Sequence, residues 1–218
     1  MQLQQVHYRS KTEETCQITP SKVVCVGRNY VDHIHELANE IPEQMVLFVK
    51  PNSAISSQLK SVHQEPLHYE AELCFMVKNG ALHAVGVGLD LTKRQLQSEL
   101  KAKSLPWERA KSFDGSALFS QFVDLSIELD GGLNEGLDSL SFTLQINGEL
   151  RQQGDVSLMM NKPQAILAEI SEFMTLIDGD IIMTGTPKGV GVIQAKDELT
   201  LSLFSQNTLL TQVSWVAS

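Results

Sequence analysis

Three acidic residues on short apolar segments are the part of this sequence best suited to chemistry. Glu70 and Glu72 are separated by one residue within the segment 69–77. Alternate residues of a β-strand project from the same face, so these carboxylates would lie about 7 Å apart along the chain. Asp90 follows at the end of a second apolar segment, 87–91. Three carboxylates at two strand ends would suit a hard divalent cation, which prefers oxygen ligands.

A β-hairpin is expected to bring these acids together. Asn79-Gly80 separates two apolar segments, and this dipeptide is typical of a two-residue hairpin turn. Its strands would place Glu70 and Glu72 near Asp90. Taken alone, the pair of glutamates has an alternative interpretation as the solvated polar face of an edge strand. The third acid and the polar residues described next favour the metal site.

His33 and Glu36 form a second group with possible chemistry. They lie three residues apart in a segment where Asn29 or Asp32 predicts the start of a short helix. At this spacing they share a helix face, so the carboxylate could orient the imidazole as a general base. The alternative is an exposed His–Glu pair, which is common on helix surfaces.

A second helix is predicted shortly after Asp90. Thr92, followed three residues later by Gln95, has the pattern of a capping box and predicts a helix over roughly 93–103. Arg94 and Gln97 are also three apart, so they would face the acidic residues together. Both could instead be solvated residues of an exposed helix.

Lys111 and a glycine-rich segment complete the candidate residues. Lys111 follows an alanine, so it is either a buried cation facing the acids or a surface lysine with an apolar stem. The segment 185–191 reads Gly-Thr-Pro-Lys-Gly-Val-Gly and lacks the phosphate-binding pattern G-x-x-x-x-G-K-[ST], so nucleotide binding is not indicated. Its N–H groups and the Thr186 hydroxyl could approach a small anion, although a plain tight loop would have the same composition.

Length and composition limit the possible classes of protein. The 218 residues predict one core-forming domain over 20–218, preceded by an extension over 1–19 with a short strand and a loop. The formal charge of −9 disfavours nucleic acid or an anionic membrane as a partner. The sequence shows neither a secretion pattern nor an apolar run of membrane-spanning length, so a cytoplasmic location is expected. The three cysteines are scattered and receive no chemical role.

Five motifs occur in an order that resembles the fumarylacetoacetate hydrolase family, specifically its short branch of acylpyruvases and oxaloacetate decarboxylases. The match extends from about residue 20 to the C-terminus. The motifs are GRNY-x-x-H-x-x-E at 27–36, YE-x-EL at 69–73, LDLT-x-R-x-x-Q at 89–97, KSFD at 111–114 and GDII-x-TGTP-x-GVG at 179–191.

The resemblance implies an α+β fold that is predominantly β, a mixed β-roll with a few flanking helices. It also implies a homodimer with one Mg²⁺ or Mn²⁺ in each active site. In this family pattern Glu70, Glu72 and Asp90 match the metal ligands. His33 and Glu36 match a water-activating pair on a lid that closes over a small 2-keto-acid substrate.

Further roles follow from the same resemblance. Lys111 matches a lysine near the substrate's oxyanion, and Gln97 and Thr186 match groups around the bound carboxylate or the developing oxyanion. Arg94 matches an arginine of the family. Two features differ from the family pattern: the 73–89 connection is shorter, and Leu118 stands where proline is common. We expect the site to be retained and an edge or dimer contact to differ.

The main function expected from the resemblance is metal-dependent hydrolysis of the C–C bond of 3-acylpyruvates, such as acetylpyruvate or fumarylpyruvate, to pyruvate and a carboxylic acid. Water activated by His33 would attack the distal carbonyl, and Lys111 would stabilise the oxyanion. The alternatives are an oxaloacetate decarboxylase or a keto–enol tautomerase on the same metal site. A non-catalytic 2-keto-acid-binding protein is the alternative from a different class.

Overall fold

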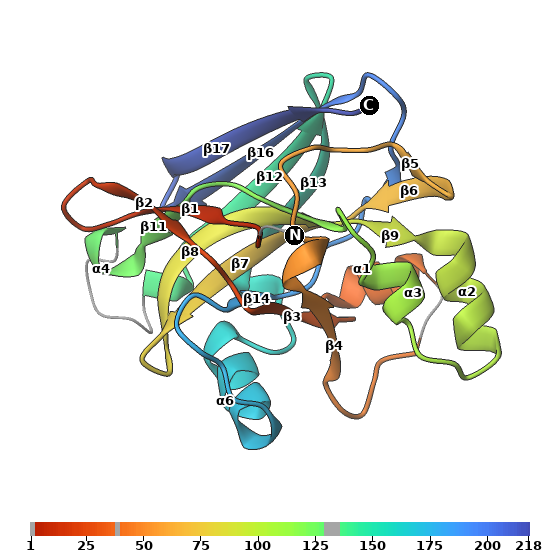
Figure 1. Cartoon of the computed structure of the whole chain (residues 1–218), viewed down its shortest axis with the longest axis horizontal. Coiled ribbons are helices and arrows are strands. Elements are labelled where there is room, and N and C mark those ends of the chain that lie inside the picture. The colour runs from red at the N-terminus through yellow and green to blue at the C-terminus, as the bar shows by residue number, and fades with distance from the viewer. Residues whose placement is uncertain (1–2, 38–39, 129–135) are drawn as a thin grey trace.

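The computed structural model describes residues 3–37, 40–128 and 136–218. In these ranges a curled mixed sheet of nine strands forms the body of the molecule (Figure 1), in the order β2-β1-β11-β8-β7-β14-β3-β4 with β10 beside β8. Its strands are β1 (Val6–Arg9), β2 (Thr15–Ile18), β3 (Lys22–Gly27), β4 (Val46–Pro51), β7 (Ala71–Lys78), β8 (Ala81–Asp90), β10 (Ala117–Phe119), β11 (Phe122–Asp124) and β14 (Ile181–Met183).

Two smaller sheets complete the β structure of the described ranges. One has the order β13-β12-β16-β17, with β12 (Leu140–Ile146), β13 (Glu149–Asp155), β16 (Glu198–Ser205) and β17 (Thr208–Val216). The other joins β15 to β6, and β6 to both β5 and β9. Its strands are β5 (Val62–His63), β6 (Glu65–Tyr69), β9 (Thr92–Lys93) and β15 (Gly191–Val192).

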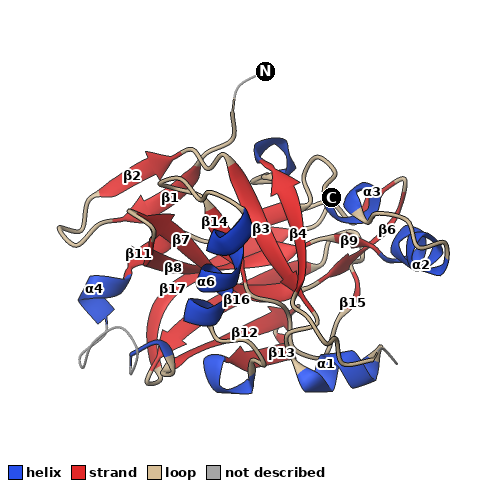
Figure 2. Cartoon of the chain, turned by 90° about the horizontal axis from the view of Figure 1, so that it is seen from below, coloured by secondary structure: helices blue, strands red, loops and turns tan. Residues whose placement is uncertain are grey.

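Short helices lie around the outside of the strands (Figure 2). They are α1 (Val31–Glu36), α2 (Arg94–Ala102), α3 (Glu108–Lys111), α4 (Leu125–Glu128) and α6 (Pro163–Phe173), with 3-10 turns η1 (Asn52–Ala54) and η2 (Val156–Leu158). The prediction of a predominantly β fold with a few flanking helices is therefore confirmed. None of the helices in the described ranges is both long enough and apolar enough to cross a membrane.

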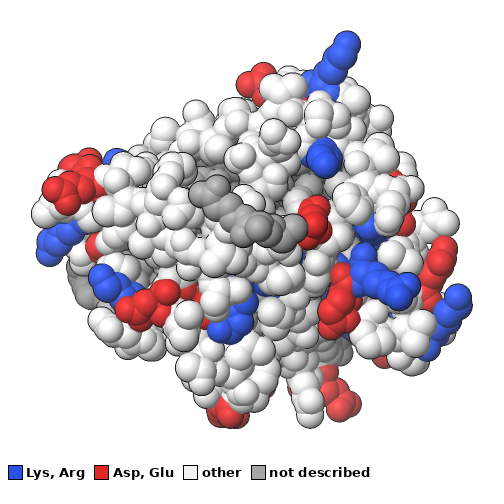
Figure 3. Space-filling model, viewed as in Figure 1, with Lys and Arg blue, Asp and Glu red and all other residues white. Residues whose placement is uncertain are grey.

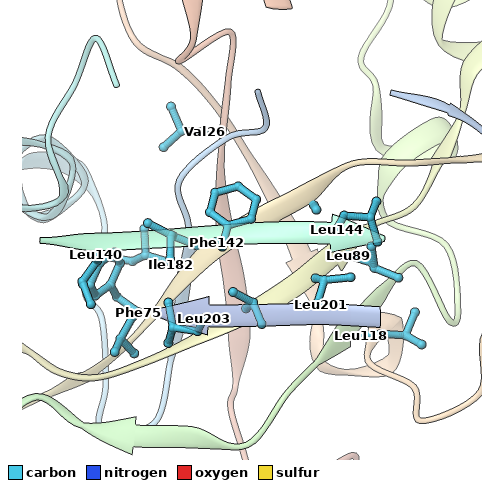
Figure 4. Packing of buried hydrophobic residues seen from close by; sticks show 14 of the residues in the cluster. Val26, Phe75, Leu89, Leu118, Leu140, Phe142, Leu144, Ile182, Leu201 and Leu203 are labelled. Atoms are coloured by element: carbon cyan, nitrogen blue, oxygen red, sulfur yellow. The ribbon is translucent and has the colours of Figure 1, made fainter. Parts of the chain in front are cut away.

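The core lies between the large sheet and the four-stranded sheet that contains β12. Every second residue of β12 is buried, because alternate side chains of a strand face the same side. Leu140, Phe142 and Leu144 therefore form one apolar row, and in Figure 4 this row lies beside Leu201 of β16 and Phe75 of β7. This apolar layer supports the hairpin that contains the acidic residues.

The predicted hairpin is present and is the longest pairing in the large sheet. Strands β7 and β8 pair antiparallel from Ala71↔Leu89 to Lys78↔Ala81. Asn79 and Gly80 have φ values of 51° and 72°, as a type I′ turn requires. This single hairpin makes the whole 73–89 connection, so no further element is needed to reach Asp90.

The first residues of the chain are more regular than the sequence predicted. One short strand and a loop were expected over residues 1–19, whereas β1 and β2 both form there. Strand β1 pairs in parallel with β11, through Tyr8↔Phe122. Strand β2 pairs with β1, through Val6↔Ile18, and its residues are mainly exposed, so it lacks the apolar alternation by which a strand is recognised in a sequence.

The predicted helix after Asp90 is present as α2, but its predicted cap is wrong. Thr92 lies in β9 and is buried, and no side chain of the N-cap residue Lys93 caps the helix. The Glu65 side chain accepts hydrogen bonds from the backbone N–H groups of Gln95 and Leu96. The Glu65 carboxylate, from the neighbouring strand β6, thus accepts hydrogen bonds from N–H groups of α2 that a local cap would otherwise have satisfied.

Charged groups on the surface are mixed in sign. On the face shown in Figure 3, acidic and basic side chains of the described residues lie interspersed among uncharged atoms. An anionic partner such as nucleic acid would therefore meet charges of both signs on this face.

Gly88 gives a test of how tightly the hairpin packs. A Cβ added there would lie 2.7 Å from the Leu118 carbonyl oxygen and 2.9 Å from Cys74 Sγ. We expect Gly88→Ala to lower the free energy of unfolding by about 1–3 kcal/mol, measured in urea, because backbone and neighbouring side chains must shift. Gly27→Ala is the control, because its nearest contact would be 3.5 Å away. Equal stability of the two variants would contradict the packing described here.

Candidate active site

The hairpin brings the three acidic residues to one point. Glu70 directly precedes β7, Glu72 lies within it, and Asp90 ends β8. The Asp90 N–H donates to the Glu70 carbonyl at 2.8 Å, and Glu72 is paired with Gly88. In this register one oxygen from each carboxylate lies within 4.8 Å of the others, and all three side chains are buried.

Three cationic side chains contact this acidic group. Lys111 Nζ donates to Glu70 Oε2 at 2.8 Å and to Asp90 Oδ2 at 2.6 Å. Arg94 contacts the other Glu70 oxygen. Lys50 Nζ lies 2.8 Å from Asp90 Oδ1, as an ion pair whose angles are outside the range of a hydrogen bond. Buried charges require such partners, since each charge has lost its contact with water.

The two glutamates differ in their electrostatic surroundings. Burial opposes ionisation of Glu70, but the charges of Lys111 and Arg94 outweigh it and hold the pKa of Glu70 below its usual range. Burial, together with the charges of Asp90 and Glu70, raises the pKa of Glu72 well above its usual range. A divalent cation beside Glu72 would reverse this effect, because it favours the ionised carboxylate.

The glycine-rich segment supports Glu72 from the side of β14. Gly185 N–H donates to Glu72 Oε2 at 2.6 Å. Gly185 has a φ of +94°, and a Cβ there would lie 2.8 Å from that of Asn29, so the position requires glycine. Thr186 Oγ1 donates to the Ala71 carbonyl at 2.8 Å. The Thr186 hydroxyl hydrogen is therefore used within the protein in this structure.

Helix α1 places His33 and Glu36 on one face, as their spacing predicted. His33 Nδ1 lies 3.1 Å from Glu36 Oε2, and His33 is only 6% exposed, so the alternative of an exposed pair does not describe this histidine. Glu36 Oε1 accepts from Gly189 N–H at 2.9 Å. An exposed ion pair between Asp32 and Lys188 also joins α1 to the glycine-rich segment.

Helices α2 and α3 supply the remaining predicted residues. Arg94 Nη1 donates to Gln97 Oε1 at 2.8 Å, so these side chains face the acidic group together, as predicted. Lys111 was expected to be either a buried cation or a surface lysine, and it is buried. Its Nζ also donates to Thr92 Oγ1 at 2.6 Å.

Lys50 and Thr92 were not recognised in the sequence as part of this cluster. Lys50 is completely buried near the end of β4, and its Nζ donates to the Lys111 carbonyl and, at 3.0 Å, to Ser116 Oγ. The available signal was a single lysine at the end of the apolar run 45–49. Such a lysine is equally typical of a strand that ends at the surface.

One small cavity unites these groups. Of the predicted site residues, only Glu36 does not line it, and Glu36 contacts His33. The predicted residues that line it are His33, Glu70, Glu72, Asp90, Arg94, Gln97, Lys111 and Thr186. The cavity volume is about 30 Å³, which is room for about two water molecules. Helix α1 forms one wall of the cavity through His33 and Ile34.

The donor set of the cavity fits a hard divalent cation. Glu70, Glu72 and Asp90 each offer an oxygen within 4.8 Å of the others, which are the ligands that Mg²⁺ and Mn²⁺ prefer. Lys111 Nζ already contacts two of these carboxylates, so cationic charge at this position is compatible with the fold.

Comparison with known proteins identifies a related group. A model of the fumarylacetoacetate (FAA) hydrolase C-terminal family matches residues 22–214. An Escherichia coli (strain K12) protein named oxaloacetate tautomerase YcgM is 38% identical over 208 residues, which cover 88% of this chain and 92% of that protein.

Solved structures show the same fold. A structure from Oleispira antarctica, named as a fumarylacetoacetate isomerase/hydrolase, matches with a TM-score of 0.88 and 33% identity, covering 97% of this chain and 99% of that one. A fumarylpyruvate hydrolase from Pseudomonas aeruginosa, in complex with Mn²⁺ and pyruvate, matches with a TM-score of 0.81 and 26% identity, covering 98% and 97% of the two chains.

Metal binding is testable without measuring activity. A cation that binds only the folded protein raises Tm by mass action, so we expect Mn²⁺ to raise the Tm of the wild-type chain. Asp90→Asn removes one charged ligand and should lower Mn²⁺ affinity by roughly 10-fold or more, measured by calorimetry, and should reduce the Tm shift.

The matched control is Asp124→Asn, which alters another buried carboxylate. This variant should keep the Mn²⁺-dependent shift even if its own Tm is lower. A shift in Asp90→Asn as large as in the wild type would contradict the ligand assignment.

Proposed function

The chain belongs to the fumarylacetoacetate hydrolase family, and from that premise we propose that it interconverts the keto and enol forms of oxaloacetate with Mg²⁺ or Mn²⁺. The proposal rests on the convergence of His33 and the acidic group, Glu70, Glu72 and Asp90, in one cavity. The relatives named oxaloacetate tautomerase support this substrate. From the sequence alone, tautomerisation was an alternative to hydrolysis, and these relatives favour the alternative.

Glu70, Glu72 and Asp90 would hold the divalent cation. When bound, the cation would polarise the 2-keto oxygen of the substrate and stabilise negative charge there. The protein fixes the three carboxylates before any ligand arrives, since Gly185 N–H holds Glu72 and Lys50 lies beside Asp90. Such preorganisation lowers the cost of assembling the site.

His33 would move the proton at C3. Keto–enol conversion transfers one proton between C3 and the oxygen on C2, with no other change in composition. When Nδ1–H donates to Glu36, His33 Nε2 is an acceptor. Nε2 can then take the proton from C3 and give it to the oxygen on C2, and in the reverse direction take it from that oxygen and return it to C3. Gly189 N–H fixes the other oxygen of Glu36, which keeps the carboxylate in position to orient the ring.

Lys111, Arg94 and Gln97 would act on the substrate's oxygens. Burial works against a charged Lys111, but Asp90 and Glu70 outweigh it and raise the pKa of Lys111. Lys111 therefore remains a positive charge, suited to stabilising an oxyanion rather than to accepting a proton. Arg94 and Gln97 line the same cavity, where their N–H groups can donate to the carboxylate of a 2-keto acid.

Hydrolysis of 3-acylpyruvates is the second candidate. The His33–Glu36 pair, in which the histidine is buried, favours it, because this pair is also suited to activating a water molecule. The structural similarity to a fumarylpyruvate hydrolase favours it as well. Decarboxylation of oxaloacetate would use the same carboxylates but needs no attacking water.

The test is the rate at which enol oxaloacetate disappears, followed by its ultraviolet absorbance with Mg²⁺, with Mn²⁺ and with excess EDTA. We expect a metal-dependent rate above that of the metal alone, and a loss of about 10²-fold or more in His33→Asn, because this variant lacks the proton-transferring group. Asp32→Asn, on the exposed side of the same helix, is the control and should remain active.

Parallel measurements separate the alternatives. Pyruvate and acetate released from acetylpyruvate would indicate the hydrolase, and CO₂ from oxaloacetate the decarboxylase. Enol conversion no faster than with metal alone would reject the tautomerase. No activity in any of the three assays would indicate a non-catalytic binding protein.

A further inference from the structure

Four cationic side chains line the cavity. Arg94 and Lys111 contact Glu70, as described above. Arg28 and Lys101 also line the cavity, together with Trp107. Among the described residues Lys101 makes no ion pair, although it is partly buried. A positive charge in this setting favours an anionic ligand.

Lys101 continues the row of polar residues that faces the cavity from α2. Arg94, Gln97 and Lys101 have the spacing i, i+3, i+7, which places them on one helix face. Over seven residues a helix advances about 10 Å, so Lys101 approaches the cavity from a point well beyond Arg94. Its Nζ lies 4.7 Å from the centre of the Trp107 ring, a cation–π contact that restricts its position.

Arg28, the residue after β3, lines the same cavity, and its Nη1 donates to the Glu40 carbonyl at 3.5 Å. It directly follows Gly27, where an added Cβ would lie 3.9 Å from the Trp107 ring. Arg28 has a φ of +59°, which is uncommon for a residue with a side chain and is often found at functional sites. Burial and the charges of Arg28, Arg94 and Lys111 lower the pKa of Lys101 to about 8. A bound anion would relieve this repulsion.

We propose that Lys101, with Arg28 beside it, binds a second, distal carboxylate of the substrate and so selects dicarboxylic 2-keto acids over monocarboxylic ones. Trp107 positions the Lys101 ammonium. The inference rests on the proposed function for the end of the substrate nearest Glu70 and adds a recognition element at the other end. Monocarboxylic acylpyruvates would leave Lys101 without an anionic partner, which disfavours them as substrates.

Binding of substrate analogues tests this subsite without turnover. The probes are 3,3-difluorooxaloacetate, which has no hydrogen at C3 and cannot enolise, and 3,3-difluoro-2-oxobutanoate, in which a methyl group replaces the distal carboxylate. Calorimetry of the wild-type chain with Mg²⁺ should show tighter binding of the dicarboxylate. Lys101→Gln should weaken dicarboxylate binding by about 10-fold or more, as expected for loss of a hydrogen bond between charged groups, and leave monocarboxylate binding unchanged.

Two variants at the C-terminal end of α2 test for indirect effects. Lys103→Gln removes the same charge from an exposed position two residues away, and it should keep the wild-type preference. Lys101→Arg keeps the positive charge and should retain most of the preference for the dicarboxylate. Equal weakening of both probes in Lys101→Gln, or no change in either, would overturn the proposal.

These outcomes are separate from those for the proposed function. If the wild-type chain fails to convert enol oxaloacetate but Lys101→Gln selectively loses the dicarboxylate, the subsite is supported and the reaction is wrong. If conversion is observed but Lys101→Gln binds both probes as the wild type does, the reaction is supported and the subsite is wrong.

Discussion

The structure depends on holding three carboxylates together away from water. Each of these residues, Glu70, Glu72 and Asp90, has one oxygen within 4.8 Å of an oxygen of the other two. The repulsion between the three carboxylates would be large in a medium of low dielectric. Lys50 and Lys111 lie close to them as compensating charges. These lysines come from β4 and α3, so the electrostatic cluster also ties a strand and a helix to the hairpin. Removing one partner would leave a buried charge uncompensated, which is strongly destabilising.

The rigidity of this cluster contrasts with the way α1 is attached. The cavity beside the carboxylates has a volume of only about 30 Å³. Helix α1 is held to the glycine-rich segment by Glu36 with Gly189 N–H and by the exposed Asp32–Lys188 pair. Exposed ion pairs contribute little stability, whereas α1 also buries Ile34 completely. Closure of α1 over the substrate, which the family resemblance implies, stays a prediction.

Local patterns in the sequence predicted much of the fold and candidate site. The turn at Asn79-Gly80 predicted the hairpin, and the spacing of His33 and Glu36 predicted a shared helix face. Contacts between distant segments were not predictable in this way. Lys50 had no sequence signal that distinguishes a buried cation from the end of a strand. The cap of α2 comes from Glu65, about 30 residues away, whereas the local pattern indicated Thr92.

The central claim is that the carboxylates at the end of the hairpin form a metal site. A crystal grown with Mn²⁺ and measured at the manganese absorption edge would locate the ion directly by its anomalous scattering. The account predicts one strong peak within bonding distance of oxygens from Glu70, Glu72 and Asp90, with Lys111 Nζ moved away from the two carboxylates that it now contacts. A peak elsewhere, or none while Lys111 keeps both contacts, would contradict the assignment.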